Sequence, residues 1–348
     1  MSGTTLGMTG SYNTNSLDQM LTVDGSIPFI QEAIDVLDIS PSPNPLTIAD
    51  YGSSHGFNSM YAIKAIIKYL KESNKLEDKK QILVVHNDLP TNHWTILFEL
   101  LNEDKSYFGV ASGRSFYESC LPSNSLSICY SSNSIHWLSR RPCQISKHCA
   151  SIRAEDNEFV AFQQQARLDL AQFLERRSSE LHIGGVLIIT IWCTNENGSS
   201  GYEQILDLLY KCAQSSTLLT EQEILDYTIP MHIRSPIECL DFELFNRCSF
   251  KLIKSTLKKV SIRLFDDYRQ GRKTLDECAR VYTQWTRSWV ESVLRQTLEM
   301  HERSTKDIET ILDQYWTHFE NAAKERPHDD IVNMCDNYLV LKKISTKT

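Results

Sequence analysis

The segment Thr47–Asn58, "TIADYGSSHGFN", begins as an apolar stretch that ends at Asp50 and continues as a turn of glycine, serine and histidine. The residues that follow, "SMYAIKAIIKYL", have the apolar spacing of an amphipathic helix. Open parallel sheets are built from strands that pass through such turns into helices, and their ligands bind at the carboxyl ends of the strands. Gly52 and Gly56 would let the backbone approach a ligand closely. The segment therefore predicts a ligand-binding turn between a strand and a helix.

The same alternation continues over the first two hundred residues. Strands are expected at 45–50, 81–90, 106–112, 125–132 and 186–192, and helices at 57–74, 94–101 and 157–180, the last one ended by Gly184-Gly185. Beyond residue 200 helices are expected at 201–214, 219–227, 273–300 and 304–325, interrupted by the stretch 249–265 and followed by a strand at 337–344. This order predicts an α/β fold with a mostly parallel sheet, helices on both faces and a largely α-helical cap. We expect an α/β domain over 1–200, a cap and substrate region over 201–335, and a final strand in 336–348 that returns to the sheet.

Composition excludes several classes of protein. The formal net charge of the 348 residues is −8, so the chain lacks the basic excess that nucleic-acid binding needs. No run of eighteen apolar residues predicts a membrane span, and the first residues do not resemble a signal peptide. The ten cysteines form no CxxC pair, and the short group of Cys143, His148 and Cys149 is too incomplete for a metal site. We therefore expect a cytoplasmic protein with reduced thiols and no metal, and a homodimer is a possible assembly.

Two carboxylates stand at the ends of the first two expected strands. The turn after Asp50 does not have the GxGxxG spacing of a pyrophosphate-binding loop, and a carboxylate at this position would repel phosphate. Asp50 would instead pair with an ammonium or sulfonium group, and Asp88 could accept hydrogen bonds from both hydroxyls of a ribose. The pattern favours S-adenosylmethionine as the ligand. A nicotinamide cofactor, or a purely structural role for these cap and turn residues, is the alternative.

Five ordered motifs carry a family resemblance. They are "SYNTNSLDQ" (11–19), "IADYGSSHGFN" (48–58), "HNDLPTNHW" (86–94), "GRSFYESCLP" (113–122) and "YSSNSIHWLSRRP" (130–142). In order and approximate spacing they resemble the SABATH family of methyltransferases, and the likeness continues through 184–192 and 227–243 to cover nearly the whole chain. The resemblance implies a class I methyltransferase-like (Rossmann-like) fold with a helical cap. It also implies S-adenosyl-L-methionine as cofactor and, as acceptor, a small molecule that is usually methylated on a carboxylate or a ring nitrogen.

The resemblance also implies roles for single residues. The cofactor would contact Tyr12, Ser16, Asp50, Gly52, Ser53, Asn58, Asp88, Leu89, Ser115 and Phe116. Gln19 and Trp137 match the pair that holds the acceptor carboxylate, and Asn133 and His136 would line the rest of the acceptor site. Trp192 ends the most apolar strand and is a further candidate for that site. Trp285 and Trp289 could also line its cap side, but their spacing of four residues is interpreted first as a packing stripe.

Departures from the family pattern leave the acceptor open. The N-terminal "MTGSY" is short and lacks a lysine or asparagine often placed near the acceptor, and His55 stands where a serine is usual. Ser53 replaces a cysteine, and Asn133 replaces a commonly aromatic residue, which makes the acceptor site roomier and more polar. A carboxylate acceptor is ionised at pH 7, so it needs orientation rather than a general base. Methylation of a heteroaromatic ring nitrogen, or a non-catalytic relative that only binds a small molecule, is the alternative function.

Overall fold

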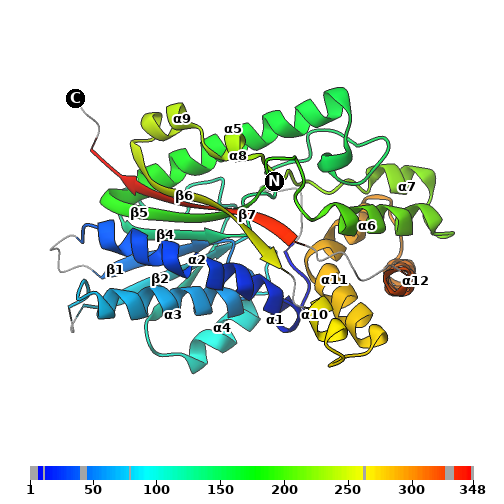
Figure 1. Cartoon of the computed structure of the whole chain (residues 1–348), viewed down its shortest axis with the longest axis horizontal. Helices are drawn as coiled ribbons and strands as arrows, with labels where there is room; N and C mark the ends of the chain where they lie inside the picture. The colour runs from blue at the N-terminus through cyan, green and yellow to red at the C-terminus, as the bar shows by residue number, and fades with distance from the viewer. Residues whose placement is uncertain are drawn as a thin grey trace.

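A twisted sheet runs through the centre of the molecule (Figure 1). The computed structural model describes residues 7–10, 12–39, 45–77, 80–261, 264–325 and 333–345. Within them the sheet has seven strands in the order β3-β2-β1-β4-β5-β7-β6. The strands are β1 (Leu46–Tyr51), β2 (Ile82–Asp88), β3 (Phe108–Gly113), β4 (Leu126–Ser132), β5 (Leu181–Trp192), β6 (Phe250–Ser261) and β7 (Asn333–Lys343). The first five are parallel, and β7 is antiparallel to both β5 and β6. The mostly parallel sheet expected from the sequence is confirmed.

Helices cover both faces of the sheet (Figure 1). On one face α2 (Leu17–Val36) and α3 (Phe57–Glu72) bury an apolar cluster against β1, β2, β4 and β7, and α4 (Trp94–Glu103) lies beside α3. On the other face α5 (Asp156–Glu180) and α9 (Phe242–Arg247) pack on β4, β5 and β6, next to the short α8 (Pro236–Cys239). Each cluster removes apolar side chains from water, which is the main stabilising contribution in such a layered fold.

The cap lies at the end of the sheet where α1 (Tyr12–Asn15) also lies. It consists of α6 (Glu203–Ser215), α7 (Glu221–Asp226), α10 (Leu264–Arg269), α11 (Leu275–Met300) and α12 (Thr305–Lys324). These helices enclose a third apolar cluster that includes Trp285, Trp289, Tyr315 and Trp316. β6 belongs to the range in which a cap was expected, yet it pairs with β7 in the sheet. The expected division of the chain into an α/β domain that ends at residue 200 and a cap that begins at residue 201 stays a prediction.

Two local expectations were wrong or incomplete. Gly184-Gly185 does not end α5, because the helix stops at Glu180 and both glycines lie inside β5. Gly184 has a φ of +87° at a register shift between β4 and β5, and a Cβ there would lie 2.5 Å from the Cβ of Asp38. These glycines therefore form a bulge against which the end of α2 packs. The helix α2 itself was not expected, because Gly25 and Pro28 interrupt its apolar pattern.

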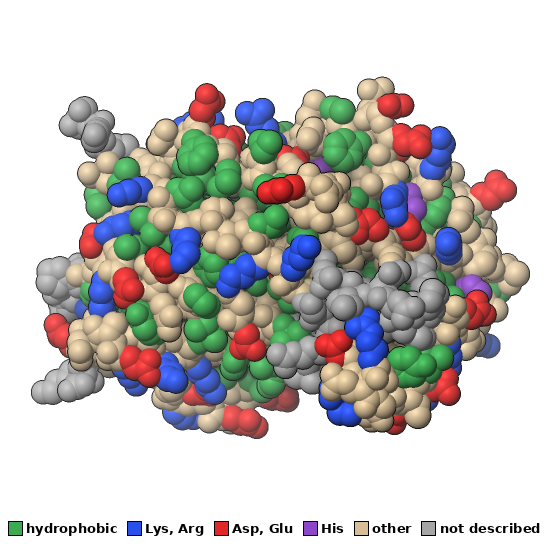
Figure 2. All heavy atoms as spheres, viewed as in Figure 1, with side chains coloured by type: hydrophobic (Ala, Val, Ile, Leu, Met, Phe, Trp, Pro, Cys, Tyr) green, Lys and Arg blue, Asp and Glu red, His purple; other side chains and the backbone are tan. Residues whose placement is uncertain are grey.

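Charges of both signs are interspersed on the face of the molecule drawn in Figure 2. None of the helices that the structure describes is long and apolar enough to cross a membrane.

Candidate active site

A cavity lies beyond the carboxyl ends of β1, β2 and β4, where neighbouring crossovers leave the sheet in opposite directions. Parallel sheets bind ligands at this kind of switch point. The cavity has about 740 Å³ of empty space, part of it open to solvent. Eight residues named from the sequence line it: Tyr12, Gly52, Asp88, Leu89, Ser115, Phe116, Asn133 and Trp137. The other seven, Ser16, Gln19, Asp50, Ser53, Asn58, His136 and Trp192, lie outside its lining.

The turn after β1 requires glycine at position 52. Gly52 has a φ of +93°, and a Cβ there would overlap the Ser134 hydroxyl and lie 2.5 Å from the Ser134 Cβ. The backbone N–H groups of Gly52 and Ser53 both donate to the Asn87 carbonyl at 2.9 Å. The turn is thus fixed between the ends of β2 and β4, and its backbone forms part of the cavity wall.

Two carboxylates stand beside this turn, Asp50, which is buried, and Asp88, which is half-buried. Asp88 accepts hydrogen bonds from the backbone N–H of Ser54 at 2.7 Å and of Leu89 at 2.8 Å, and burial raises its pKa. Each oxygen keeps a lone pair, so Asp88 can still accept hydrogen bonds from a ligand in the cavity. Burial raises the pKa of Asp50 to about 7, and the charge of Asp88 adds to the shift although the Ser59 hydroxyl opposes it. A cationic ligand group would stabilise the ionised form of both carboxylates.

Many polar atoms around the cavity are buried without a hydrogen-bond partner. Among the residues named from the sequence, these atoms are Ser16 Oγ, Gln19 Oε1, Ser53 Oγ, Asn58 Oδ1, Asn133 Oδ1, His136 Nδ1 and Trp192 Nε1. Buried polar groups are normally paired, so such a group of unpaired atoms on segments beside one cavity indicates a polar ligand or ordered water. The residues present therefore fit a nucleoside cofactor together with a second small molecule.

The N-terminal strap, which we define as residues 7–10 and 12–15, closes one side of the cavity through Gly7, Met8 and Tyr12. Its contacts reach three different elements. Gly7 N–H donates to Thr91 Oγ1 at 3.1 Å before α4, and Thr9 N–H donates to the Ser288 carbonyl of α11 at 3.2 Å. The Asn13 amide donates to the His55 carbonyl at 3.2 Å. The strap therefore connects the ligand-binding turn to the cap.

His55 has a role in this contact that sequence reasoning did not assign. Its imidazole is fully buried, and neither ring nitrogen has a hydrogen-bond partner. The ring lies edge-on to Tyr12, with centroids 5.8 Å apart, and to His93, with centroids 5.1 Å apart. Burial, and then the nearby His93, lower the pKa of His55 to about 4. A neutral imidazole thus supports the strap, and the only signal in the sequence was histidine in place of the usual serine.

Aromatic side chains form the cap end of the cavity. Trp137 and Trp289 both line it, with ring centroids 6.5 Å apart and planes at 66°. Behind them Trp192 stacks on His136 at 3.9 Å and meets Trp289 edge-on at 5.8 Å. Burial and the charge of Arg234 hold the pKa of His136 well below 6.5, so this ring is a weak base. Trp289 lines the cavity besides packing in the cap, so both interpretations of this tryptophan hold, whereas Trp285 lies outside the lining.

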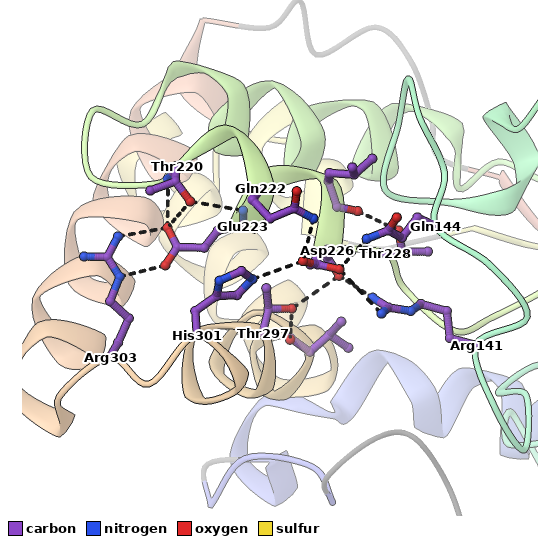
Figure 3. Close-up of polar contacts among 12 residues, drawn as sticks. Arg141, Gln144, Thr220, Gln222, Glu223, Asp226, Thr228, Thr297, His301 and Arg303 are labelled. Carbon is purple, nitrogen blue, oxygen red and sulfur yellow. Dashed lines mark hydrogen bonds and ion pairs between the residues drawn. The ribbon is translucent and has the colours of Figure 1, made fainter.

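The end of α7 fixes the position of the cap relative to the loop after β4 (Figure 3). The Asp226 carboxylate accepts hydrogen bonds from Gln144 at 2.6 Å and bonds to His301, just past α11, at 3.0 Å. Its backbone carbonyl accepts from Arg141 at 2.6 Å and from Thr297 of α11 at 3.5 Å. The loop and α11 carry opposite walls of the cavity, so this network, which we call the Asp226 junction, sets the distance between them.

Comparison with known proteins places the chain in a family. The family model described as "SAM dependent carboxyl methyltransferase" matches residues 5–343, and the chain belongs to this family. The chain is 28% identical over 293 residues to S-adenosyl-L-methionine:benzoic acid/salicylic acid carboxyl methyltransferase 3 of Petunia hybrida, covering 78% of this chain and 82% of the relative. It is 32% identical over 255 residues to a probable S-adenosylmethionine-dependent methyltransferase of Arabidopsis thaliana, covering 64% and 69%. A solved structure of loganic acid methyltransferase with SAH shares the fold, with a TM-score of 0.80, 22% identity and coverage of 98% and 99%.

The protein is therefore an S-adenosylmethionine-dependent carboxyl methyltransferase with a class I methyltransferase fold. The family, the fold class and the cofactor expected from the sequence are confirmed, and a nicotinamide cofactor is set aside. In the described part of the chain no group of three or more His, Cys, Asp or Glu side chains could hold a metal ion.

Proposed function

We propose that the acceptor is a small-molecule carboxylic acid, and that Gln19 and Trp137 orient its carboxylate for methylation. When bound, S-adenosylmethionine supplies an electrophilic methyl group on a sulfonium. The product of the transfer is a methyl ester, with S-adenosylhomocysteine left behind. The observation that carries the proposal is the cavity itself, which extends from Asp88 at the end of β2 to Trp137 and Trp289 beneath the cap.

The cofactor would bind in the part of the cavity nearest β1 and β2. Asp88 would hold the ribose hydroxyls, because its carboxylate lies in the wall and keeps free lone pairs. Leu89 and Phe116 would flank the adenine, and Ser115 would contact its edge. Asp50 lies near the end of β1, two residues before Gly52, and its negative charge would stabilise the cationic methionine end. Ser16, Ser53 and Asn58 would contact this end as well, since each carries a buried atom without a partner.

The acceptor residues would act by binding the acceptor carboxylate and orienting it. A carboxylate is already ionised at neutral pH, so the protein has to align its oxygen rather than remove a proton. The Gln19 amide and the Trp137 indole N–H are neutral donors suited to a carboxylate. His136 is too weak a base for proton removal, in line with this chemistry. Trp192 would support the site by stacking on His136.

A screen of small acids with methyl-labelled cofactor tests the proposal, with label in an ester as the readout. For an acid that is methylated, Gln19→Leu and Trp137→Phe should each lower turnover ten- to a hundredfold, which corresponds to about 1.5–3 kcal/mol for a hydrogen bond to a charged group. Affinity for S-adenosylhomocysteine should not change. Trp316→Phe is the matched control, because it deletes an indole N–H in α12 that is buried away from the cavity. Full activity in both site variants would disprove the orienting role.

A cytoplasmic location and a homodimer remain parts of the proposal. Light scattering coupled to size exclusion, over a range of protein concentrations, measures the assembly directly.

A further inference from the structure

We propose that His86 is a positioning residue, which acts through Ser59 to direct a hydrogen bond onto Asp50 and so holds this carboxylate ionised for the cofactor. The inference rests on the proposed placement of Asp50 beside the cationic methionine end of the cofactor, and it adds the groups that govern the charge of Asp50. These groups lie in the sheet and under α3, outside the lining of the cavity.

Asp50 and His86 lie side by side in the sheet. They are register partners on the parallel strands β1 and β2, so their side chains point to the same face. That face is covered by α3, which carries Ser59, and the three side chains are buried. Tyr107, just before β3, is buried in the apolar cluster of the same face. Four polar side chains from separate segments therefore meet in an otherwise apolar layer.

A chain of hydrogen bonds joins these four side chains. His86 Nδ1 lies 2.8 Å from Ser59 Oγ, and His86 Nε2 lies 3.3 Å from the Tyr107 hydroxyl. Burial raises the pKa of Asp50 to about 7, and a hydrogen bond from the Ser59 hydroxyl opposes this shift. The chain thus runs from the Tyr107 phenol through the imidazole and the serine to the carboxylate.

Tyr107 fixes the direction of the chain. Burial raises the pKa of Tyr107 and lowers the pKa of His86 to about 4, so at neutral pH the phenol keeps its proton and the imidazole carries one. Among the described residues, the phenol has His86 Nε2 as its acceptor, so the imidazole proton stays on Nδ1. Nδ1–H then donates to Ser59 Oγ, which leaves the Ser59 proton for Asp50. The other tautomer would draw the Ser59 proton to His86 and deprive Asp50 of this donor.

The other charges around Asp50 make this donor important. The negative charge of Asp88 acts with burial to raise the pKa of Asp50. The remaining titratable groups that face Asp50 are neutral between pH 6.0 and 8.5, because burial raises their pKa values: Tyr12, Tyr107, Cys129 and Tyr130. A carboxylate that burial and Asp88 both push towards its protonated form needs donors to stay ionised. His86 keeps one such donor, the Ser59 hydroxyl, aimed at Asp50.

Calorimetry with S-adenosylhomocysteine at pH 6.0, 7.0 and 8.5 tests the inference. The informative quantity is the ratio of wild-type to variant affinity, which cancels the titration of Asp88 and of the ligand's own amino group. In Ser59→Ala, losing a hydrogen bond to a charged group should move the titration of Asp50 from about pH 7 to about pH 8. The variant should then bind about five- to tenfold more weakly at pH 6.0 and 7.0, but less than about twofold more weakly at pH 8.5. His86→Leu should behave in the same way.

Further variants show that His86 acts through Ser59. Adding His86→Leu to Ser59→Ala should cause no further loss, whereas His86→Asn, whose amide can donate from the place of Nδ1, should restore wild-type affinity. Tyr107→Phe should cause a smaller loss with the same dependence on pH. Tyr130→Phe is its matched control, because it deletes a buried phenol beside Asp50 that bonds to Ser26 at 3.0 Å. The ligand control is 5′-methylthioadenosine, which lacks the ammonium and should bind wild type and variants equally.

The tautomer of His86 gives a second readout that needs no ligand. In protein labelled with nitrogen-15, the imidazole signals that His86→Leu removes should show a protonated Nδ1 and an unprotonated Nε2 at pH 7.0. Thermal melting shows which variants are folded. Ser59→Ala deletes one oxygen atom, so it decides the comparison if His86→Leu does not fold.

Three results would overturn the inference and leave the proposed function standing. They are an affinity ratio that does not vary with pH, additive losses in the double variant, and a protonated Nε2. Asp50→Asn tests the placement on which the inference rests: wild-type affinity in this variant would refute both, whereas weaker binding that no longer responds to His86→Leu would support both. Loss of acid methylation with intact cofactor binding in the wild type would count against the proposed function alone.

Discussion

Replacing His55 with asparagine should change how the stability of the protein depends on pH. The imidazole is fully buried between Tyr12 of the strap and His93 at the start of α4. Burial is the main cause that lowers its pKa from 6.5 to about 4, the positive charge of His93 adds to the shift, and the polar backbone of Met8 nearby opposes both. The ring is therefore kept neutral in the folded chain by the packing of the strap.

The sign of the effect follows from the two protonation states. Between pH 6.5 and 4 the unfolded chain binds a proton at His55 and the folded chain does not, so the unfolded state is favoured as pH falls. The stabilising contribution is complete above pH 6.5 and is lost on the way down to pH 4. A full shift would change the free energy of unfolding by about 2 kcal/mol between pH 6.5 and 5. We expect about 1 kcal/mol, because water at the exposed His93 side screens the charge.

Urea unfolding of the wild type and His55→Asn at pH 5.0, 6.5 and 8.0 measures how much the titration of His55 contributes to the free energy of unfolding. Other buried groups also titrate: His86, with a pKa of about 4, acts in the same direction, whereas Asp50 and Asp336, with pKa values near 7, stabilise the fold less as pH rises. The informative quantity is therefore the difference between the two proteins. The wild type should have the larger free energy of unfolding at pH 8.0, and its advantage over His55→Asn should be about 1 kcal/mol smaller at pH 5.0. A difference that does not vary with pH would refute the reasoning, and His318→Asn, at an exposed histidine, is the control.

Further expected outcomes concern the turn, the ribose contact and the cap. Gly52→Ala should weaken the binding of S-adenosylhomocysteine at least tenfold in calorimetry, because a left-handed alanine costs about 1–2 kcal/mol and its Cβ overlaps Ser134. Adding Ser134→Gly should restore only the part of the affinity that is lost through the overlap. Full recovery of the affinity would show that the backbone is not strained. Asp88→Ala should weaken the same ligand ten- to a hundredfold, since each buried hydroxyl left unpaired costs about 1–3 kcal/mol; equal affinity would remove Asp88 from the ribose site. Asp226→Asn should raise the KM for the acceptor severalfold in steady-state kinetics with little change in cofactor affinity, and an unchanged KM would mean that the Asp226 junction does not set the cap position.

The sheet and its main helices could be predicted from the sequence because their apolar periods are regular. α3 combines apolar residues on one face with a glycine-rich start, and β5 is a nearly continuous β-branched run. α2 could not be predicted in this way, since Pro28 and Gly25 lie in its interior. Glycine is favoured at position 25 because a side chain there would collide with Tyr338 of β7. This contact joins residues more than three hundred positions apart.

The cavity could be predicted only in part. Residues at strand ends or directly after them, such as Asp88, Gly52 and Asn133, line it, because parallel strands bring their carboxyl ends to one edge. Trp289 could be named only as one of two candidates in α11, because its spacing fits packing equally well and only the docking of the cap brings it to the cavity. Gln19 shows the opposite limit: its motif matches, yet its side chain lies outside the lining, so its role stays a prediction.

The position of β7 has a consequence for biosynthesis. This strand pairs with both β5 and β6, so it occupies the interior of the sheet although its residues, 333–343, come late in the chain. It also supports α2, because Asp336 accepts a hydrogen bond from Thr22 at 3.2 Å and the Tyr338 hydroxyl donates to the Thr22 carbonyl at 3.3 Å. A ribosome that has synthesised residues 1–332 therefore holds a chain whose β5 and β6 are not yet joined and whose α2 lacks its support.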